Sequence, residues 1–250
     1  MAQLKDDCFA FGGALMPVDE ATAILADRVT SVAGHETVPL ADALGRVLAE
    51  DVSAPRDVPP HDNSAVDGYA VFFDDLILDA ETRLPVGGRV AAGHPLGRDS
   101  QRGEAIRIFT GATMPDGMDT VFMEEDCSVE GDTVRLPPGL KHGANRRHRG
   151  EDVQTGDIVV ASGTRLRPQE LGLAASVGRG TLSVFQPLRA AVFSTGDEVR
   201  DPSDDAPDGC IFDANRYTVL GMLKDLGCHV TDLGILSDDE DSMAVALATA

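Results

Sequence analysis

The C-terminal part of the chain takes its architecture from the stretch Arg189-Ala190-Ala191-Val192-Phe193-Ser194-Thr195-Gly196-Asp197-Glu198. Its run of small apolar residues up to Ser194 predicts a strand buried on both faces, as strands of parallel sheets are. Asn215–Leu226 predicts a helix, because apolar residues recur at helical spacing and Gly227 follows them. Cys228–Leu236 predicts a second strand, and Ser237-Asp238-Asp239-Glu240 matches a capping box that opens another helix. This order of elements predicts a parallel α/β unit over residues 185–250.

The predicted α/β unit is short for an independent domain. Two strands and two helices leave a sheet edge and much of one face uncovered. The last residues, from Met243 to Ala250, continue a helical pattern that contains no stop signal. We therefore expect that the chain is truncated and that a longer parent continues past Ala250.

A small all-β domain is predicted over residues 57–138. Two adjacent prolines, Pro59 and Pro60, make the segment before it extended or loop-like and suggest a crossing between domains. Short apolar runs separated by Gly/Pro turns are typical of all-β domains. The expected strands are Tyr69–Phe73, Leu84–Val90, Ala105–Phe109, Thr120–Met123, Cys127–Val129 and Thr133–Leu136.

The remaining segments, 1–56 and 139–184, are assigned to a linker domain of helices and strands. Two helices, Val18–Val32 and Leu40–Ala49, are expected to pack into a core through apolar residues at helical spacing. Pro168 at a first turn and Gly178 as a stop signal predict a helix from Pro168 to Val177. Strands are expected at Ile158–Ala161 and Thr181–Val184.

Composition excludes several classes of protein. The 250 residues carry 21 basic and 42 acidic side chains, a formal net charge of −21, which argues against a general nucleic-acid binder. No apolar stretch is long enough to cross a bilayer, and the N-terminus does not resemble a secretory signal. The four cysteines form no C-x-x-C pair and are expected to stay reduced in a cytoplasmic protein.

Three polar clusters precede the α/β unit, and each has two interpretations. His61–Ala70 contains Asp62 and could bind a metal or an oxyanion, although its spacing favours a network of turns and caps. Phe109–Pro115 presents the Thr110 hydroxyl at a strand end, where an ordinary turn is the stronger interpretation. Asn145–Asp152 could recognise phosphate through its arginines or form a self-neutralising turn, and the pattern does not separate these.

Two further clusters lie at the expected carboxyl edge of the parallel strands. Ser194-Thr195-Gly196-Asp197-Glu198 follows the first strand, at the edge where open α/β sheets bind ligands. Asp197 and Glu198 could hold Mg²⁺, which prefers oxygen ligands, although an ordinary β–α loop is the alternative. Asp238 follows the second strand at the same edge, and helix capping alone is sufficient to explain it.

Taken in order, these motifs closely resemble the molybdopterin molybdotransferase family, which includes the C-terminal domain of gephyrin. The N-terminal stretches Asp7–Ala10 and Pro17–Ala21 are similar to its bacterial members, and the resemblance covers essentially the whole chain. The motifs that carry it are Asp62–Ala70, Thr110-Gly111-Ala112, Arg149-Gly150-Glu151-Asp152, Phe193–Glu198 and Asp213-Ala214-Asn215-Arg216.

The resemblance implies the last step of molybdenum cofactor synthesis, in which adenylylated molybdopterin and molybdate give the finished cofactor and AMP with the help of Mg²⁺. It implies an elongated homodimer, with the active cleft between the β domain of one subunit and the α/β domain of the other. By motif position, the functional residues are Asp62, Thr110, Asp152, Glu198 and Asp238. Glu198 and Asp238 would contact Mg²⁺ or the pterin, together with Ser194, Thr195, Gly196 and Asp197.

The chain departs from this family in one respect, because it contains neither the Gly-Gly-Ser-rich loop nor the C-terminal β domain that follow in family members. A second interpretation is therefore a dimeric binding or scaffold module without turnover. A third is the related molybdopterin adenylyltransferase, against which the long region before the α/β unit argues. The choice between molybdenum and tungsten is left open by the sequence.

Overall fold

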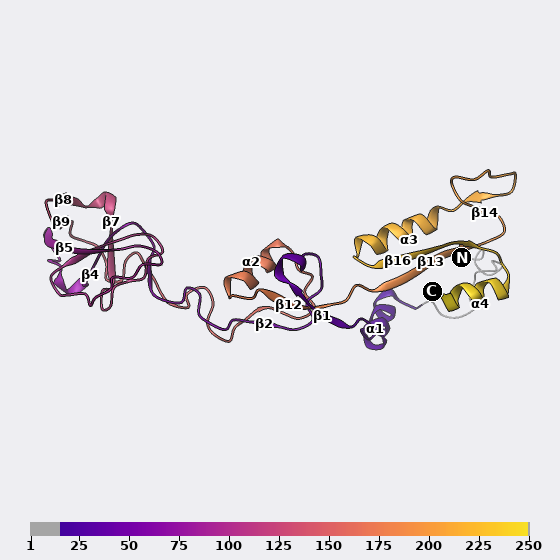
Figure 1. Cartoon of the computed structure of the whole chain (residues 1–250), viewed down its shortest axis with the longest axis horizontal. Coiled ribbons are helices and arrows are strands. Elements are labelled where there is room, and N and C mark those ends of the chain that lie inside the picture. Colours follow the sequence, from indigo (N-terminus) through magenta and orange to yellow (C-terminus); the bar gives the residue numbers. More distant parts are fainter. Residues whose placement is uncertain (1–15, 250) are drawn as a thin grey trace. The chain divides into compact units, whose positions relative to one another are not determined.

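The computed structural model describes residues 16–249, which belong to two compact units (Figure 1). One unit spans residues 35–185, and the other combines the described residues 16–34 with 186–249. The similarity noted at Asp7–Ala10 lies outside the described residues. The predicted boundaries of three domains, at residues 57, 139 and 185, stay predictions.

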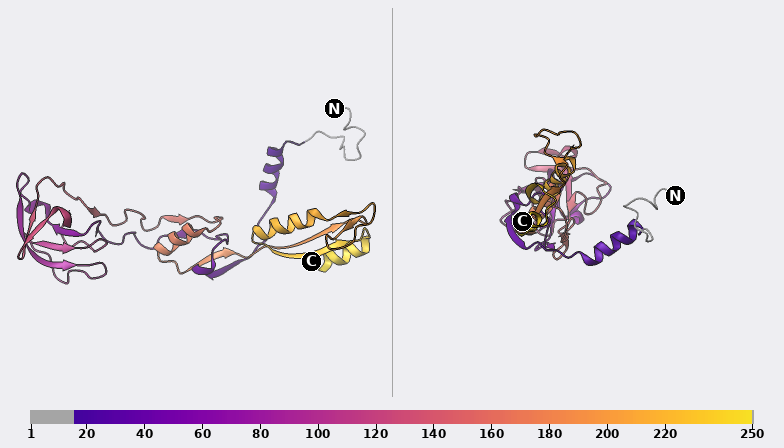
Figure 2. Two further views of the ribbon diagram at one scale, coloured as in Figure 1. Left: turned by 90° about the horizontal axis from the view of Figure 1, so that it is seen from above. Right: turned by 90° about the vertical axis from the view of Figure 1, so that its right-hand side faces the viewer.

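A curled six-stranded mixed sheet forms much of the first unit (Figure 1, Figure 2). The strand order is β7-β4-β6-β5-β9-β8, and only the neighbours β5 and β6 run parallel. Two of the predicted strands, Thr120–Met123 and Thr133–Leu136, have the expected bounds, and the others differ by one to three residues. The strands are β4 (Gly68–Val71), β5 (Thr82–Val90), β6 (Ala105–Ile108), β7 (Thr120–Met123), β8 (Ser128–Glu130) and β9 (Thr133–Leu136).

Alternating apolar residues on this sheet give it two buried clusters. Ile106 and Ile108 of β6 lie in one cluster, whereas Val134 and Leu136 of β9 lie in the other. The strands were predicted from short apolar runs between Gly/Pro turns, and these runs supply the residues of both clusters. Single-turn 3-10 helices connect some strands, namely η2 (Phe73–Asp75) and η3 (Glu124–Asp126).

The rest of this unit is built from strand pairs around a third apolar cluster, which includes Leu48, Leu166 and Val184. The crossing segment predicted before residue 64 runs antiparallel to the chain after residue 146 through two short ladders. The ladders are β1–β12, β2–β11 and β3–β10, and one helix, α2 (Pro168–Ser176), belongs here. The strands are β1 (His35–Pro39), β2 (Val52–Ser53), β3 (Asn63–Ser64), β10 (Arg146–Arg147), β11 (Ile158–Val160) and β12 (Thr181–Phe185).

The helix predicted at Leu40–Ala49 is wrong. Only a single 3-10 turn, η1 (Leu40–Asp42), forms there. Gly45 adopts a positive φ of 77° and donates its N–H to the carbonyl of Leu166, which ends the helical path. Leu48 then forms a bridge with Val184, so its apolar side chain is buried between strands.

The second unit contains the predicted parallel pair. Strand β13 (Arg189–Thr195) pairs with β16 (His229–Leu236), and helices α3 (Ala214–Asp225) and α4 (Glu240–Thr249) lie on opposite sides of the pair (Figure 1, Figure 2). A small parallel ladder, β14 (Val199–Arg200) with β15 (Ile211–Phe212), interrupts the connection from β13 to α3.

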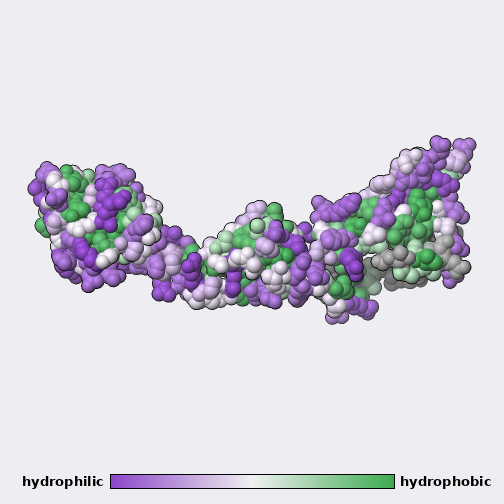
Figure 3. All heavy atoms as spheres, viewed as in Figure 1, coloured by the Kyte–Doolittle hydropathy of each residue, from purple (hydrophilic) through white to green (hydrophobic). Residues whose placement is uncertain are grey.

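Two expectations about burial in this unit are wrong. Strand β13 is not buried on both faces, because its sheet has two strands and only Val192 of β13 is buried. Helix α1 (Val18–Arg28) has no buried residue, and it ends before Val32. Apolar spacing predicted the helix correctly, but spacing does not show what covers the apolar face. Figure 3 shows apolar side chains at the surface of this unit, where Val219 and Met222 of α3 are exposed.

No helix within residues 16–249 has the length and apolar character required to cross a membrane.

Candidate functional site

Three of the predicted clusters, far apart in sequence, meet in the first unit. Ser64 donates its N–H to the Ala112 carbonyl and accepts one from Gly111, each at 2.9 Å. Ser64 also pairs with Arg146 in the β3–β10 ladder. The structure therefore brings the segments of Asp62, Thr110 and Asp152 together. We call Asp62, Asp67, Thr110, Arg147 and Asp152 the Thr110 group.

Asp67 fixes the orientation of the Thr110 side chain. One carboxylate oxygen, Oδ1, accepts hydrogen bonds from both the backbone N–H and the hydroxyl of Thr110, each at 2.7 Å. These two bonds lower the pKa of Asp67 below its ordinary value. Because the hydroxyl proton is directed at Asp67, the lone pairs of the Thr110 oxygen are left to accept a bond from a ligand.

Asp62 contacts the basic segment that follows residue 145. Its Oδ1 accepts the backbone N–H of Arg149 at 2.7 Å. Its Oδ2 lies 3.6 Å from Nε of Arg146 and 4.0 Å from Nδ1 of His148. These contacts hold a half-buried carboxylate among positive groups.

The arginines of this basic segment already have acidic partners. Arg147 lies 2.5 Å from Asp152 and 3.2 Å from Glu151, and Arg149 pairs with Asp57. A hydrogen bond from the His148 backbone and the pairing with Arg147 lower the pKa of Glu151. Of the two interpretations of residues 145–152, these pairs favour the self-neutralising turn, because an arriving phosphate must compete with carboxylates already bound.

The remaining predicted residues belong to the second unit, at the carboxyl edge of the parallel pair. Thr195 and Leu236 are partners at the ends of β13 and β16, so Glu198 and Asp238 follow these strands at the same edge. We call Ser194, Thr195, Gly196, Asp197, Glu198 and Asp238 the Glu198 group.

The turn after β13 depends on the glycine at its start. Gly196 has a φ of +138°, which residues with a side chain rarely adopt. A Cβ on Gly196 would lie 2.9 Å from Oε2 of Glu198 and 2.7 Å from a methyl carbon of Val199. The carboxylate of Glu198 therefore folds back over the backbone of Gly196.

The donor set of the Glu198 group suits a hard cation shared with a substrate. Among residues 16–249, no three His, Cys, Asp or Glu side chains cluster closely enough to hold a metal by themselves. Glu198 and Asp238 supply carboxylates at one sheet edge, and Mg²⁺ is commonly held by one or two carboxylates together with substrate phosphates and water. A self-contained metal centre of protein ligands does not fit this donor set.

Sequence reasoning did not select Asp67, Asp57 and Arg216 as individual site residues. Asp57 accepts the N–H and hydroxyl of Thr155 at 2.8 and 2.7 Å, and Arg216 makes ion pairs with three carboxylates. Asp67 and Arg216 belong to two of the motifs that carry the family resemblance, so the sequence marked their positions as candidates. Their partners are 15 to 43 residues away, except for Asp213, and spacing along the chain does not reveal them.

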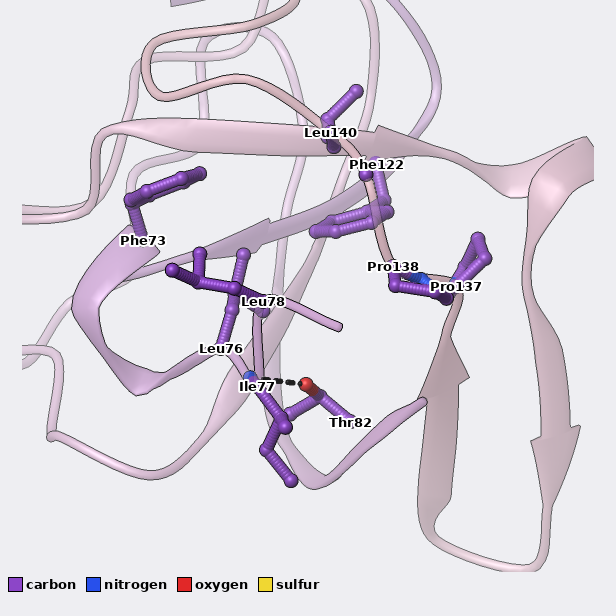
Figure 4. A pocket seen from close by; sticks show the side chains of 10 residues that line it. Phe73, Leu76, Ile77, Leu78, Thr82, Phe122, Pro137, Pro138 and Leu140 are labelled. Carbon is purple, nitrogen blue, oxygen red and sulfur yellow. Dashed lines mark hydrogen bonds between the residues drawn. The ribbon is translucent and has the colours of Figure 1, made fainter. Parts of the chain in front are cut away.

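A separate apolar pocket lies on the first unit (Figure 4). Phe73, Leu76, Phe122 and Leu140 point toward it, and the hydroxyl of Thr82, also in its lining, accepts the N–H of Ile77 at 2.8 Å. The lining carries no charged side chain, so the pocket does not suit an anionic ligand.

Comparison with known proteins gives one consistent result. Residues 16–178 match the family model described as the MoeA N-terminal region (domain I and II). A molybdopterin molybdenumtransferase of Haemophilus influenzae is 37% identical over 237 residues, covering 94% of this chain and 58% of that protein. One of Synechococcus elongatus is 37% identical over 214 residues, covering 84% of this chain and 53% of that protein.

A solved structure agrees with these sequence matches. The molybdopterin biosynthesis MoeA protein of Pyrococcus horikoshii superposes with a TM-score of 0.86 at 33% identity, covering 95% of this chain and 64% of that one. The chain spans less than two thirds of the length of each of these proteins.

Proposed function

Because this chain belongs to the family of the MoeA N-terminal region, we propose that it acts in molybdenum cofactor biosynthesis as a molybdopterin molybdenumtransferase. The reaction inserts molybdate into adenylylated molybdopterin and releases AMP. Both substrates are anions, so the site needs a cation, hydrogen-bond donors, or groups that move protons near them.

The observation that supports this proposal most is the meeting of Asp62, Thr110 and Asp152. Their motifs are separated by dozens of residues, yet they are joined by backbone hydrogen bonds through Ser64. A set of unrelated surface turns would have no reason to converge in this way. Relatives of this chain, which carry the name molybdopterin molybdenumtransferase, support the choice of reaction.

In the Glu198 group, we assign Glu198 and Asp238 to a Mg²⁺ ion that is shared with a substrate phosphate. An ion held by these two carboxylates would supply positive charge beside the substrate phosphate and the leaving AMP. Ser194, Thr195, Gly196 and Asp197 surround the turn and are assigned to contacts with the pterin substrate. The parallel pairing of β13 and β16 places these residues at one edge, as ligand sites of open α/β sheets require.

In the Thr110 group, the Thr110 oxygen accepts a hydrogen bond from the substrate while Asp67 holds its proton. Asp62 and Asp152 are carboxylates with arginine neighbours. They are assigned to accept protons from water or substrate hydroxyls during the reaction.

Three further features belong to the same proposal. The chain is divided into a linker domain, a β domain over 57–138 and a molybdopterin-binding α/β domain from residue 185. It forms a homodimer, which light scattering of the purified chain would measure as twice the mass of the monomer. It works in the cytoplasm, where its substrates are made.

The proposal is tested by mixing the purified chain with adenylylated molybdopterin, molybdate and Mg²⁺. Released AMP is measured by chromatography, and the finished cofactor by activation of a cofactor-free molybdenum enzyme. Glu198→Gln serves as the variant that removes one charge at the edge, and its folding is checked by circular dichroism.

Four outcomes separate the possibilities. AMP release that depends on molybdate and on Glu198 supports the proposal. Binding of adenylylated molybdopterin without AMP release favours the binding or scaffold module, and adenylylation of free molybdopterin from ATP favours the adenylyltransferase. Absence of binding and of both reactions contradicts the assigned function for this chain.

A further inference from the structure

Arg216 is a buried cation that none of the assigned roles uses. Its side chain is 5% exposed, and its guanidinium contacts three carboxylates. Nε donates to Asp213 at 2.9 Å, Nη1 to Asp232 at 2.5 Å and Nη2 to Asp201 at 2.6 Å. The pKa of Arg216 is raised above its ordinary value by Asp232 first and then by Asp213. All three donor directions of the planar group are therefore used.

The three carboxylates come from three different segments of the second unit. Asp201 directly follows β14, Asp213 precedes the first residue of α3, and Asp232 lies in β16. Helix capping accounts for only one of them, because Asp213 Oδ1 already accepts the N–H of Arg216 at 3.1 Å. The two terminal nitrogens bind Asp232 of β16 and Asp201 after β14. A helix cap requires neither of these contacts, so the side chain also connects α3 to two other segments.

Each of these segments leads directly to the Glu198 group. Asp201 is three residues beyond Glu198, and two hydrogen bonds from Ser203 and one from Tyr217 lower its pKa to about 2. Ser194 at the end of β13 bonds to the side chain of Asp213. Asp232 accepts the N–H of Gly234 at 2.9 Å, at the point where the register of β16 with β13 is irregular. Asp238 follows the end of this strand.

We propose that Arg216 is a positioning residue, which fixes the turn carrying Glu198 relative to β16, the strand that Asp238 follows. It does so by ion pairs with Asp201, Asp213 and Asp232. This inference rests on the proposed function in one respect, because that function assigns Glu198 and Asp238 to the same ligand. A lysine at position 216 would not replace it, since an ammonium on a flexible stem cannot meet three carboxylates in the fixed geometry of a guanidinium.

The charge balance explains why the test should not begin at Arg216 itself. Removing it would leave three carboxylates facing one another, one of them buried, and loss of folding would be the expected result. Asp201→Asn is gentler. It keeps an oxygen for Ser203 and leaves Arg216 paired with Asp213 and Asp232. It removes the ion pair to the turn together with the oxygen that accepts the Tyr217 hydroxyl.

Asp204→Asn is the matched control, because Asp204 is an exposed acid of the same loop and the charge change is identical. Hydrogen exchange is measured by mass spectrometry on peptides covering residues 196–212 and 232–240. Mg²⁺ affinity is measured by calorimetry in the presence of adenylylated molybdopterin. We expect Asp201→Asn to speed exchange in both peptides, since local opening exposes amides. We expect its Mg²⁺ affinity to fall about 10-fold or more, as is usual when support of a metal ligand is lost. Asp204→Asn should match the wild type in both measurements.

Unchanged exchange in both peptides of Asp201→Asn would overturn the positioning role, whatever the Mg²⁺ result. Faster exchange throughout the second unit, α3 included, would also overturn it, because that pattern indicates a general stabilising ion pair. If the wild-type chain does not bind Mg²⁺ with adenylylated molybdopterin present, the metal assignment of the proposed function fails, and the exchange data still decide the role of Arg216.

Discussion

Asp67 Oδ1 accepts two hydrogen bonds from Thr110, one from its backbone N–H and one from its hydroxyl, each 2.7 Å long. The residues are 43 positions apart, so the carboxylate joins the loop before β4 to the turn after β6. The pair holds the Thr110 oxygen in one orientation before any ligand arrives. Groups oriented in advance bind a ligand without an additional entropic cost.

Removal of the Thr110 hydroxyl should weaken substrate binding. Thr110→Val keeps the shape of the side chain but cannot accept a bond from a donor group of the substrate. We therefore expect the affinity for adenylylated molybdopterin to fall by roughly 2- to 10-fold, the effect of one ordinary hydrogen bond. Calorimetric titration measures it. Thr113→Val, in the same turn, is the control and should bind as the wild type does. Equal affinities for Thr110→Val and the wild type would exclude the hydroxyl as a substrate contact.

The hydrogen bonds that Asp57 accepts should make the free energy of unfolding depend on pH in the acid range. Hydrogen bonds from the side chain and then the backbone of Thr155, with a further one from Arg149, lower the pKa of Asp57 to about 2 from 3.8. A lowered pKa stabilises the folded state above the unfolded value of 3.8, and the contribution is lost as pH falls toward 2. Thermal melts of Asp57→Asn and the wild type should therefore differ at pH 6 and converge as the pH falls from 4 to 2.

The exposed acid Asp79 provides the comparison for this melt series, because Asp79→Asn removes the same charge without removing a bond to Thr155. Its difference from the wild type should stay small across the same range of pH. A gap between Asp57→Asn and the wild type that persists unchanged at pH 2 would contradict the assigned role of the ionised carboxylate.

Sequence periodicity predicted local elements better than it predicted their surroundings. The strands at Thr120–Met123 and Thr133–Leu136 are correct because each is a short run rich in apolar and β-branched residues that is bounded by turn residues. The helix at Leu40–Ala49 is wrong because Gly45 turns the chain and Leu48 is buried in a bridge with Val184, 136 residues away. A partner so distant in the sequence leaves no trace in the spacing of apolar residues around Leu48.

The same distinction applies to the candidate site. Motif positions identified the segments of Asp62, Thr110 and Asp152, and their meeting in one place agrees with that choice. Asp67 stood inside a quoted motif without being selected, because its role depends on Thr110. Whether Glu198 and Asp238 share a ligand is a question of side-chain placement at a sheet edge, which pattern alone does not answer.

The close approach of β4 and β7 at Gly68 should make that position intolerant of a side chain. A Cβ there would lie 1.7 Å from the carbonyl oxygen of Phe122, which is backbone and paired in the sheet. We expect Gly68→Ala to lower the free energy of unfolding by more than about 2 kcal/mol, as large steric conflicts in a core do. Urea denaturation measures this. Gly172→Ala, in helix α2 with open space around it, should be neutral or slightly stabilising.

The thiol of Cys127 should react slowly with alkylating reagents in the folded protein. Burial first, and then the charges of Asp126, Glu124 and Glu125, raise its pKa to about 11 from 9.0. Because the thiolate is the reactive form, alkylation by iodoacetamide at pH 8 should be about 100-fold slower than in the unfolded chain. Peptide mass spectrometry follows the site with and without urea. Equal rates in the two conditions would contradict the structural cause.

Gly196 offers a way to move the Glu198 carboxylate without changing it. A Cβ at this position would lie 2.9 Å from Oε2 of Glu198, and the carboxylate would have to leave its place over the turn. Gly209 lies in the same loop region with a φ of +90° and nothing within 4 Å, so Gly209→Ala imposes backbone strain without this conflict. Both variants should lose roughly 1 kcal/mol of stability from the strained backbone. Only Gly196→Ala should also weaken Mg²⁺ and adenylylated molybdopterin binding, by about 10-fold, because a small displacement of a positioned group is costly. Equal binding by the two variants would mean that the position of the Glu198 carboxylate is irrelevant to the ligand, and Glu198 would then lose its assigned role.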